Sequence, residues 1–142
     1  MAYGSSVYQG HVNNWGPQLA IDHHVSSIRT GYFHSAREAY PYLYVDFGVS
    51  VTIGTVNIVH RKDCCLTRFH DVEIRIGDVP IVGTGQPITV NDLCTFVVQA
   101  YQQTTFTCEG GVKRGRYLSI QIKSAATNEI LQINEVTTTG KA

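Results

Sequence analysis

The chain carries little charge, and neither sign predominates. Its 142 residues include 11 basic and 11 acidic side chains, and charged residues make up 15% of the sequence. This balance gives no electrostatic basis for binding nucleic acid or an anionic membrane. A charged fraction this low is unusual for a cytosolic protein. The surface must rely on Ser, Thr, Asn, Gln and Tyr, as in many secreted β proteins, so we expect an extracellular location.

Long apolar runs are missing as well. No stretch approaches the roughly 18 apolar residues of a membrane span, so we expect no insertion into a membrane. The first ten residues, MAYGSSVYQG, have neither the basic nor the apolar part of a signal peptide. Either the chain is not secreted or a signal has been removed. The sequence has no internal repeat or linker, and its length suits a single domain over residues 1–142.

No window shows a convincing amphipathic helix, whereas alternation of polar and apolar residues is frequent. The alternating or β-branched runs fall at residues 42–47, 51–59, 71–76, 96–100, 104–107, 118–123 and 131–134. We expect the runs at 96–100 and 104–107 to form a hairpin. Many short strands separated by turn residues predict an all-β antiparallel sandwich or barrel. The longest segment without a strand pattern, roughly 9–41, is a candidate for functional loops.

The four cysteines are Cys64, Cys65, Cys94 and Cys108. An even number in a weakly charged, β-rich chain favours disulfides and an oxidising compartment. A zinc site is the alternative, but zinc ligands come in pairs two to four residues apart. Adjacent cysteines do not fit that spacing.

A disulfide between Cys64 and Cys65 would be strained. Neighbouring Cα atoms lie about 3.8 Å apart, whereas relaxed disulfides need roughly 4.4–6.8 Å. Such strain persists where a site uses it, here as a rigid apolar knob on a loop. The alternatives are two free thiols, or separate bonds to Cys94 and Cys108. Because those two flank 13 residues that resemble a hairpin, we favour Cys94–Cys108 as a structural bridge and Cys64–Cys65 as a vicinal one.

Charged residues surround the adjacent cysteines. Arg61 and Arg68 are planar, multiply hydrogen-bonding donors, and Asp63 between them can orient both guanidinium groups. The alternative is a surface cluster of ion pairs, which contributes little to stability. The eight residues from Arg61 to Arg68 do not decide between these two interpretations.

The spacing of a wider set of residues is more specific. His34 is followed by 26 residues, then by Arg61-x-Asp63, four residues and Arg68. This pattern resembles the fucose-binding signature of the F-type lectins, or fucolectins, and adjacent cysteines within it also resemble that family. Further similar stretches fall at residues 19–22, 44–48, 72–77, 115–118 and 134–136, so the resemblance covers about residues 5–137.

The resemblance implies an eight-stranded antiparallel β-sandwich of jelly-roll type, related to discoidin domains, with a shallow site on loops at one end. His34 is expected to hydrogen-bond the axial 4-hydroxyl of L-fucose. Arg61 and Arg68 are expected to donate to the ring oxygen and the 3- and 4-hydroxyls. The predicted sugar-binding residues are His34, Arg61, Asp63, Cys64, Cys65 and Arg68.

The apolar part of the site is less well defined by the resemblance. The Cys64–Cys65 ring is expected to pack on the C1–C2 edge of the sugar, and the fucose methyl group in a nearby pocket. The segment between Asp22 and His34 is shorter than in relatives, and it helps to shape that pocket. Phe33 and residues 8–15 are our candidates for its walls.

The family usually holds a structural calcium ion near its first loop. Two carboxylates, several carbonyls and a hydroxyl would suit an ion that prefers six to eight oxygen ligands. The ligands implied by the resemblance are the side chains of Asp22 and Glu135 and the carbonyls of Leu19, His24 and Asn134. The alternative is a loop without metal that hydrogen bonds hold in place.

The leading hypothesis is a non-catalytic lectin for terminal α-L-fucose. One site per chain binds weakly, so avidity would need a homo-oligomer or tandem repeats. A discoidin-like adhesion module that binds lipid or protein would share the sandwich but would not need the His34, Arg61 and Arg68 constellation. An enzyme is disfavoured, because redox cysteine pairs have two intervening residues and no pair of carboxylates suited to glycoside hydrolysis stands out.

Overall fold

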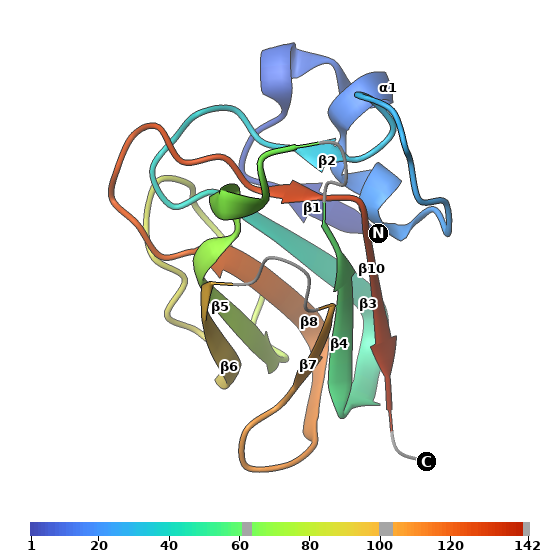
Figure 1. Ribbon diagram of the computed structural model, residues 1–142. Coiled ribbons are helices and arrows are strands. Elements are labelled where there is room, and N and C mark those ends of the chain that lie inside the picture. Colours follow the sequence, from blue (N-terminus) through green and yellow to red (C-terminus); the bar gives the residue numbers. More distant parts are fainter. Residues whose placement is uncertain (61–63, 100–103, 141–142) are drawn as a thin grey trace.

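The protein is a sandwich of two antiparallel sheets with short helices at one end (Figure 1). The computed structural model describes residues 1–60, 64–99 and 104–140. The larger sheet has the order β1 (Ala2–Gly4), β3 (Tyr42–Ile53), β8 (Lys113–Ile122), β5 (His70–Gly77) and β6 (Asp92–Gln99). The smaller sheet has the order β10 (Glu135–Thr139), β4 (Thr55–Val59) and β7 (Thr105–Thr107). The two sheets together contain eight strands in the described ranges, which confirms the predicted eight-stranded sandwich.

Six shorter elements complete the described fold. A two-stranded ribbon joins β2 (Phe33–His34) to β9 (Gln132–Ile133). The helices are η1 (Tyr8–Gly10), α1 (Val12–Trp15), η2 (Pro17–Ile21) and η3 (Leu66–Arg68). Figure 1 shows that α1, the β2 ribbon and the green helix η3 gather at one end of the sandwich. No helix in the described ranges is long and apolar enough to cross a membrane.

The core lies between the two sheets, and the alternation of the sequence explains it. In β5 every second residue from Val72 to Ile76 is buried, and β8 buries Leu118, Ile120 and Ile122. The smaller sheet contributes Val56 and other apolar side chains from the facing side. Full burial of one such side chain stabilises the fold by about 1.5–3 kcal/mol. The loops at the end of the sandwich are therefore attached to stable strands.

Strand β3 is longer than the sequence predicts. The sequence predicts separate strands at 42–47 and 51–59, but the chain around Gly48 continues the strand through a bulge, with a shift of register between Asp46 and Val51 opposite β8. Gly48 has a φ of 81° and donates its backbone N–H to Asp46 Oδ1 over 2.8 Å. The chain instead turns at Gly54, between β3 and β4.

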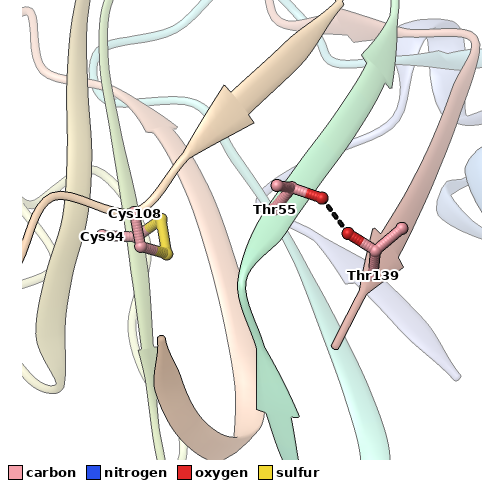
Figure 2. The surroundings of a disulfide bond; sticks show 4 residues. All are labelled: Thr55, Cys94, Cys108 and Thr139. Carbon is pink, nitrogen blue, oxygen red and sulfur yellow. Dashed lines mark hydrogen bonds between the residues drawn. A yellow bond between two sulfur atoms is a disulfide. The ribbon is translucent and has the colours of Figure 1, made fainter. Parts of the chain in front are cut away.

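The predicted hairpin of 96–100 and 104–107 is wrong. Strand β6 pairs with β5 in the larger sheet, and β7 pairs with β4 in the smaller one, so each is an edge strand of a different sheet. The Cys94–Cys108 disulfide therefore joins the two sheets instead of closing a hairpin (Figure 2). Glu109 N–H donates to the Cys94 carbonyl over 2.7 Å beside it. Figure 2 also shows the hydroxyl pair of Thr55 and Thr139, which links β4 to β10.

The inter-sheet disulfide predicts a measurable loss of stability on its removal. Replacing both Cys94 and Cys108 by Ser opens a loop with a sequence separation of 14 residues. We expect the free energy of unfolding to fall by about 3 kcal/mol, measured by urea denaturation. The matched control is the double replacement of Cys64 and Cys65 by Ser. These neighbours enclose no chain loop, so we expect a change below about 1 kcal/mol. Equal losses from the two double variants would contradict this account.

Candidate functional site

A pocket opens around His34 at the end of the sandwich where the short helices gather. Its volume is about 250 Å³. The residues that line it are Tyr8, Trp15, Arg29, Tyr32, His34, Arg37, Arg68 and Ile130. They come from four stretches that are far apart in the sequence, so the fold and not local sequence assembles the pocket.

His34 is held in a defined orientation. It is 6% exposed on β2, which pairs with β9 at Gln132. Its Nδ1 donates to the Ser35 carbonyl over 2.7 Å, so Nε2 is the acceptor nitrogen of the neutral ring. The imidazole packs 4.4 Å from the Tyr8 ring and 6.2 Å from the rings of Trp15 and Tyr32.

The aromatic wall of the pocket is tied to the neighbouring loop. Tyr8 and Trp15 meet edge to face at 4.9 Å. The Trp15 indole N–H donates to the Arg29 carbonyl over 3.0 Å, and Gly31 N–H donates to the Asn14 carbonyl over 2.8 Å. Both aromatic residues fall in the segment 8–15 that the sequence analysis offered for the apolar wall.

Phe33 was the other candidate for that wall, and this choice is wrong. Its side chain is fully buried in the core and lies against Gly4, where an added Cβ would stand only 2.6 Å from the ring. Alternation along β2 explains the result, because successive side chains of a strand point to opposite sides. Phe33 points into the core, and Tyr32 and His34 point into the pocket.

Arg68, from a distant part of the sequence, lines the same pocket. It ends η3, and its backbone N–H donates to the Cys65 carbonyl over 3.1 Å. The next residue, Phe69, is buried and contacts the rings of His60 and Phe106 at 4.6 and 6.1 Å. Gln99 on β6 donates its Nε2–H to the Phe69 carbonyl over 3.2 Å. The core thus anchors the loop that carries Arg68.

Cys64 and Cys65 are bonded to each other, with Cα atoms 3.8 Å apart. Since no cysteine is free, the alternatives of free thiols, crossed pairing and a zinc site are wrong. Cys64 is exposed and Cys65 partly buried, one turn of η3 from Arg68, and neither lines the pocket itself. The predicted ligands Arg61 and Asp63 lie outside the described residues.

The structure brings His34 and Arg68 together in one pocket and adds residues that the sequence analysis did not name. Arg29, Tyr32, Arg37 and Ile130 also line the pocket. Alternation around His34 could have identified Tyr32. The two arginines lie in loops without periodicity, so no pattern marks them.

A pair of acidic side chains lies apart from the pocket, where η2 meets the start of β10. Glu135 is 5% exposed, and burial together with the adjoining Asp22 carboxyl raises its pKa to about 7. The Glu135 Oε2 accepts from His23 N–H over 3.3 Å, and Asp22 Oδ1 accepts from His24 N–H over 3.0 Å. The buried Glu135 Oε1 has no hydrogen-bond partner among the described residues.

Hydrogen bonds from Asn134 hold the loop beside this acidic pair. The Asn134 side chain accepts from Ser26 N–H over 2.8 Å and donates to the Ser26 carbonyl over 2.7 Å. The Ser26 hydroxyl in turn donates to the Thr30 carbonyl. In the part of the chain that the structure describes, no three His, Cys, Asp or Glu side chains converge as metal ligands.

Comparison with known proteins identifies the fold and a family. The family model for a NedA-like, galactose-binding domain of the F5/F8 type C group matches residues 19–120. The fucolectin from the serum of Morone saxatilis (striped bass) has a TM-score of 0.82 and 24% identity, and the match covers 99% of this chain and 46% of that one. This chain thus spans about half the length of that fucolectin. No curated protein matches the chain in sequence.

Two further solved structures match over almost their full length. The lectin domain of lectinolysin, complexed with Lewis B antigen, has a TM-score of 0.76 and 18% identity, with coverage of 100% of this chain and 93% of that one. A fucose-binding module of Streptococcus pneumoniae has a TM-score of 0.73 and 15% identity, with coverage of 100% and 94%. At these identities the matches show the fold.

Proposed function

The chain belongs to the NedA-like, galactose-binding domain family, and from this premise we propose that it is a non-catalytic lectin for terminal α-L-fucose on glycans. The observation that carries the proposal is the convergence of His34 and Arg68 with an aromatic wall in one pocket. The striped bass protein is a fucolectin, and the lectinolysin domain is complexed with Lewis B antigen. These neighbours support a sugar ligand, and the pocket contains the hydrogen-bonding groups and the apolar rings that a sugar ligand needs.

A monosaccharide offers hydroxyl groups on its edges and C–H groups on its faces. The Arg68 guanidinium donates to sugar oxygens, and the His34 imidazole pairs with a hydroxyl that is both donor and acceptor. Each hydrogen bond to a charged group contributes about 1.5–3 kcal/mol. The rings of Tyr8 and Trp15 offer apolar area for the C–H groups.

The vicinal disulfide serves as a second apolar surface in this proposal. A ring of two bonded cysteines has no side-chain rotamers to lose on binding, so contact with it costs little entropy. Cys64 is exposed, one turn before Arg68, as such a contact requires. Arg61 and Asp63 complete the proposed site, Arg61 as a second donor and Asp63 as the acceptor that orients both arginines.

The proposal extends to location and assembly. Two disulfides favour an oxidising compartment, so we propose a secreted protein. One pocket of this size binds a monosaccharide weakly. Useful affinity for a fucosylated surface would come from homo-oligomers or tandem repeats that engage several glycans at once.

Sugar binding is tested with a fucosylated glycan array and calorimetry with L-fucose. We expect signal on glycans with terminal fucose and a loss of at least about tenfold in affinity for His34→Ala and for Arg68→Ala. The matched control is Arg114→Ala, an exposed arginine whose Nη1 donates to the Thr52 hydroxyl over 3.4 Å, outside the pocket. This control should retain full affinity. A blank array with both disulfides formed, or equal losses in all three variants, would refute the fucose proposal.

We further propose that Asp22 and Glu135 bind a structural calcium ion with the carbonyls of Leu19, His24 and Asn134. The fit rests on the acidic pair. The buried Glu135 Oε1 has no partner in the described part of the chain, and burial together with the adjoining Asp22 carboxyl raises the Glu135 pKa. A divalent cation would supply the missing partner and offset the repulsion of two ionised carboxylates. The ion would hold η2 and the loop after it against β10.

The calcium proposal is tested by thermal unfolding at pH 7.5 with calcium and with a chelator. A hundredfold excess of calcium over its Kd should raise the Tm by about 5 °C or more. Glu135→Gln should abolish this shift, whereas Glu109→Gln, at an exposed acid elsewhere, should preserve it. Identical melting curves with calcium and with the chelator would rule the ion out.

A further inference from the structure

Positive charge is concentrated in the pocket of an otherwise neutral chain. Arg29, Arg37 and Arg68 all line it, and none of the described residues that line it is acidic. The formal net charge of the chain is zero, so this concentration is local and not a consequence of composition. The pocket therefore favours a ligand that carries negative charge.

Two of these arginines differ from the arginines elsewhere in the described structure. Arg75 pairs with Glu73 at 2.6 Å, and Arg116 pairs with Asp46 at 2.7 Å. Arg29 and Arg37 are exposed, and their guanidinium groups make no hydrogen bond or ion pair within residues 1–60, 64–99 and 104–140. They are the two pocket cations that the fold itself does not use.

Backbone hydrogen bonds hold both of these residues in place. The Arg29 carbonyl accepts from the Trp15 indole N–H over 3.0 Å. Beside Arg37, Ala36 N–H donates to the Ser6 hydroxyl over 2.9 Å, and Glu38 N–H donates to the Glu129 carbonyl over 3.0 Å. Arg37 is thus fixed by both of its neighbours, and only side-chain freedom is lost when the guanidinium groups bind.

A neutral fucose does not need this charge. In the proposed function His34, Arg61 and Arg68 bind the sugar hydroxyls, and Arg29 and Arg37 remain unused in the lining of the same pocket. The planar guanidinium fork matches the paired oxygens of a carboxylate or a sulfate, and it binds them more strongly than it binds neutral hydroxyls. An anionic group next to the fucose would meet both arginines.

We propose that the preferred ligand is a fucosylated glycan with an anionic group, sulfate or carboxylate, on the sugar next to the fucose, and that Arg29 and Arg37 bind this group. The inference rests on the proposed fucose function. It assigns a second, charge-selective part to the same pocket. The neutral fucose fixes the glycan in place, and the anion determines which fucosylated glycans bind best.

The test compares three versions of one fucosylated oligosaccharide: neutral, sulfated and sialylated on the sugar next to the fucose. Calorimetry at low and at physiological salt measures the affinity of each. We expect the better acidic version to bind about fivefold or more tightly than the neutral one, with an advantage that shrinks as salt screens the charge. Comparison of the sulfated with the sialylated version shows whether the pocket prefers a sulfate or a carboxylate.

The double variant Arg29→Gln with Arg37→Gln should reduce the ratio of acidic to neutral affinity to about one, while Arg114→Gln should preserve the wild-type ratio. Equal affinity for the neutral and acidic versions would overturn this inference and leave the fucose proposal standing. A preference that survives in the double variant would also overturn it. Failure of all three versions to bind would instead refute the proposed function and the inference with it.

Discussion

The burial of Phe33 is the contact on which the site depends. Its ring lies in the core against Gly4, where no larger residue would leave room, and its burial contributes about 1.5–3 kcal/mol. Because side chains alternate along β2, this anchor turns His34 to the opposite side. Pairing with β9 then fixes the position of β2. The orientation of the histidine follows from the packing of its neighbour.

The same principle operates on the opposite side of the pocket. Phe69 is buried next to Arg68 and contacts Phe106, so the guanidinium is carried by a loop that the core holds. The loop from Asp22 to His34 is fixed at its other end by the hydrogen bonds between Asn134 and Ser26. This one loop separates two regions of opposite charge, an acidic pair at η2 and an arginine-rich pocket.

The sequence predicted the parts of this arrangement that follow from periodicity or from specific spacing. Alternation identified the strands and the sandwich. The spacing along the sequence from His34 to Arg68 identified two residues that line one pocket. Alternation identifies a strand but not its partner, so β6 and β7 were paired wrongly although each exists. The contributions of Arg29 and Arg37 depend on how long loops fold back onto β2. That depends on tertiary hydrogen bonds, which leave no mark in local sequence.

The central claim is that the pocket around His34 binds the sugar. The chain has one tryptophan, Trp15, and its indole N–H lies in the pocket wall, so it gives a single side-chain signal in a ¹H–¹⁵N correlation spectrum. On titration with L-fucose, the account predicts a saturable shift of this indole signal together with the amides around His34 and Arg68. No saturable shift, or one centred on the cleft beside Glu135 and Thr137 instead, would contradict it.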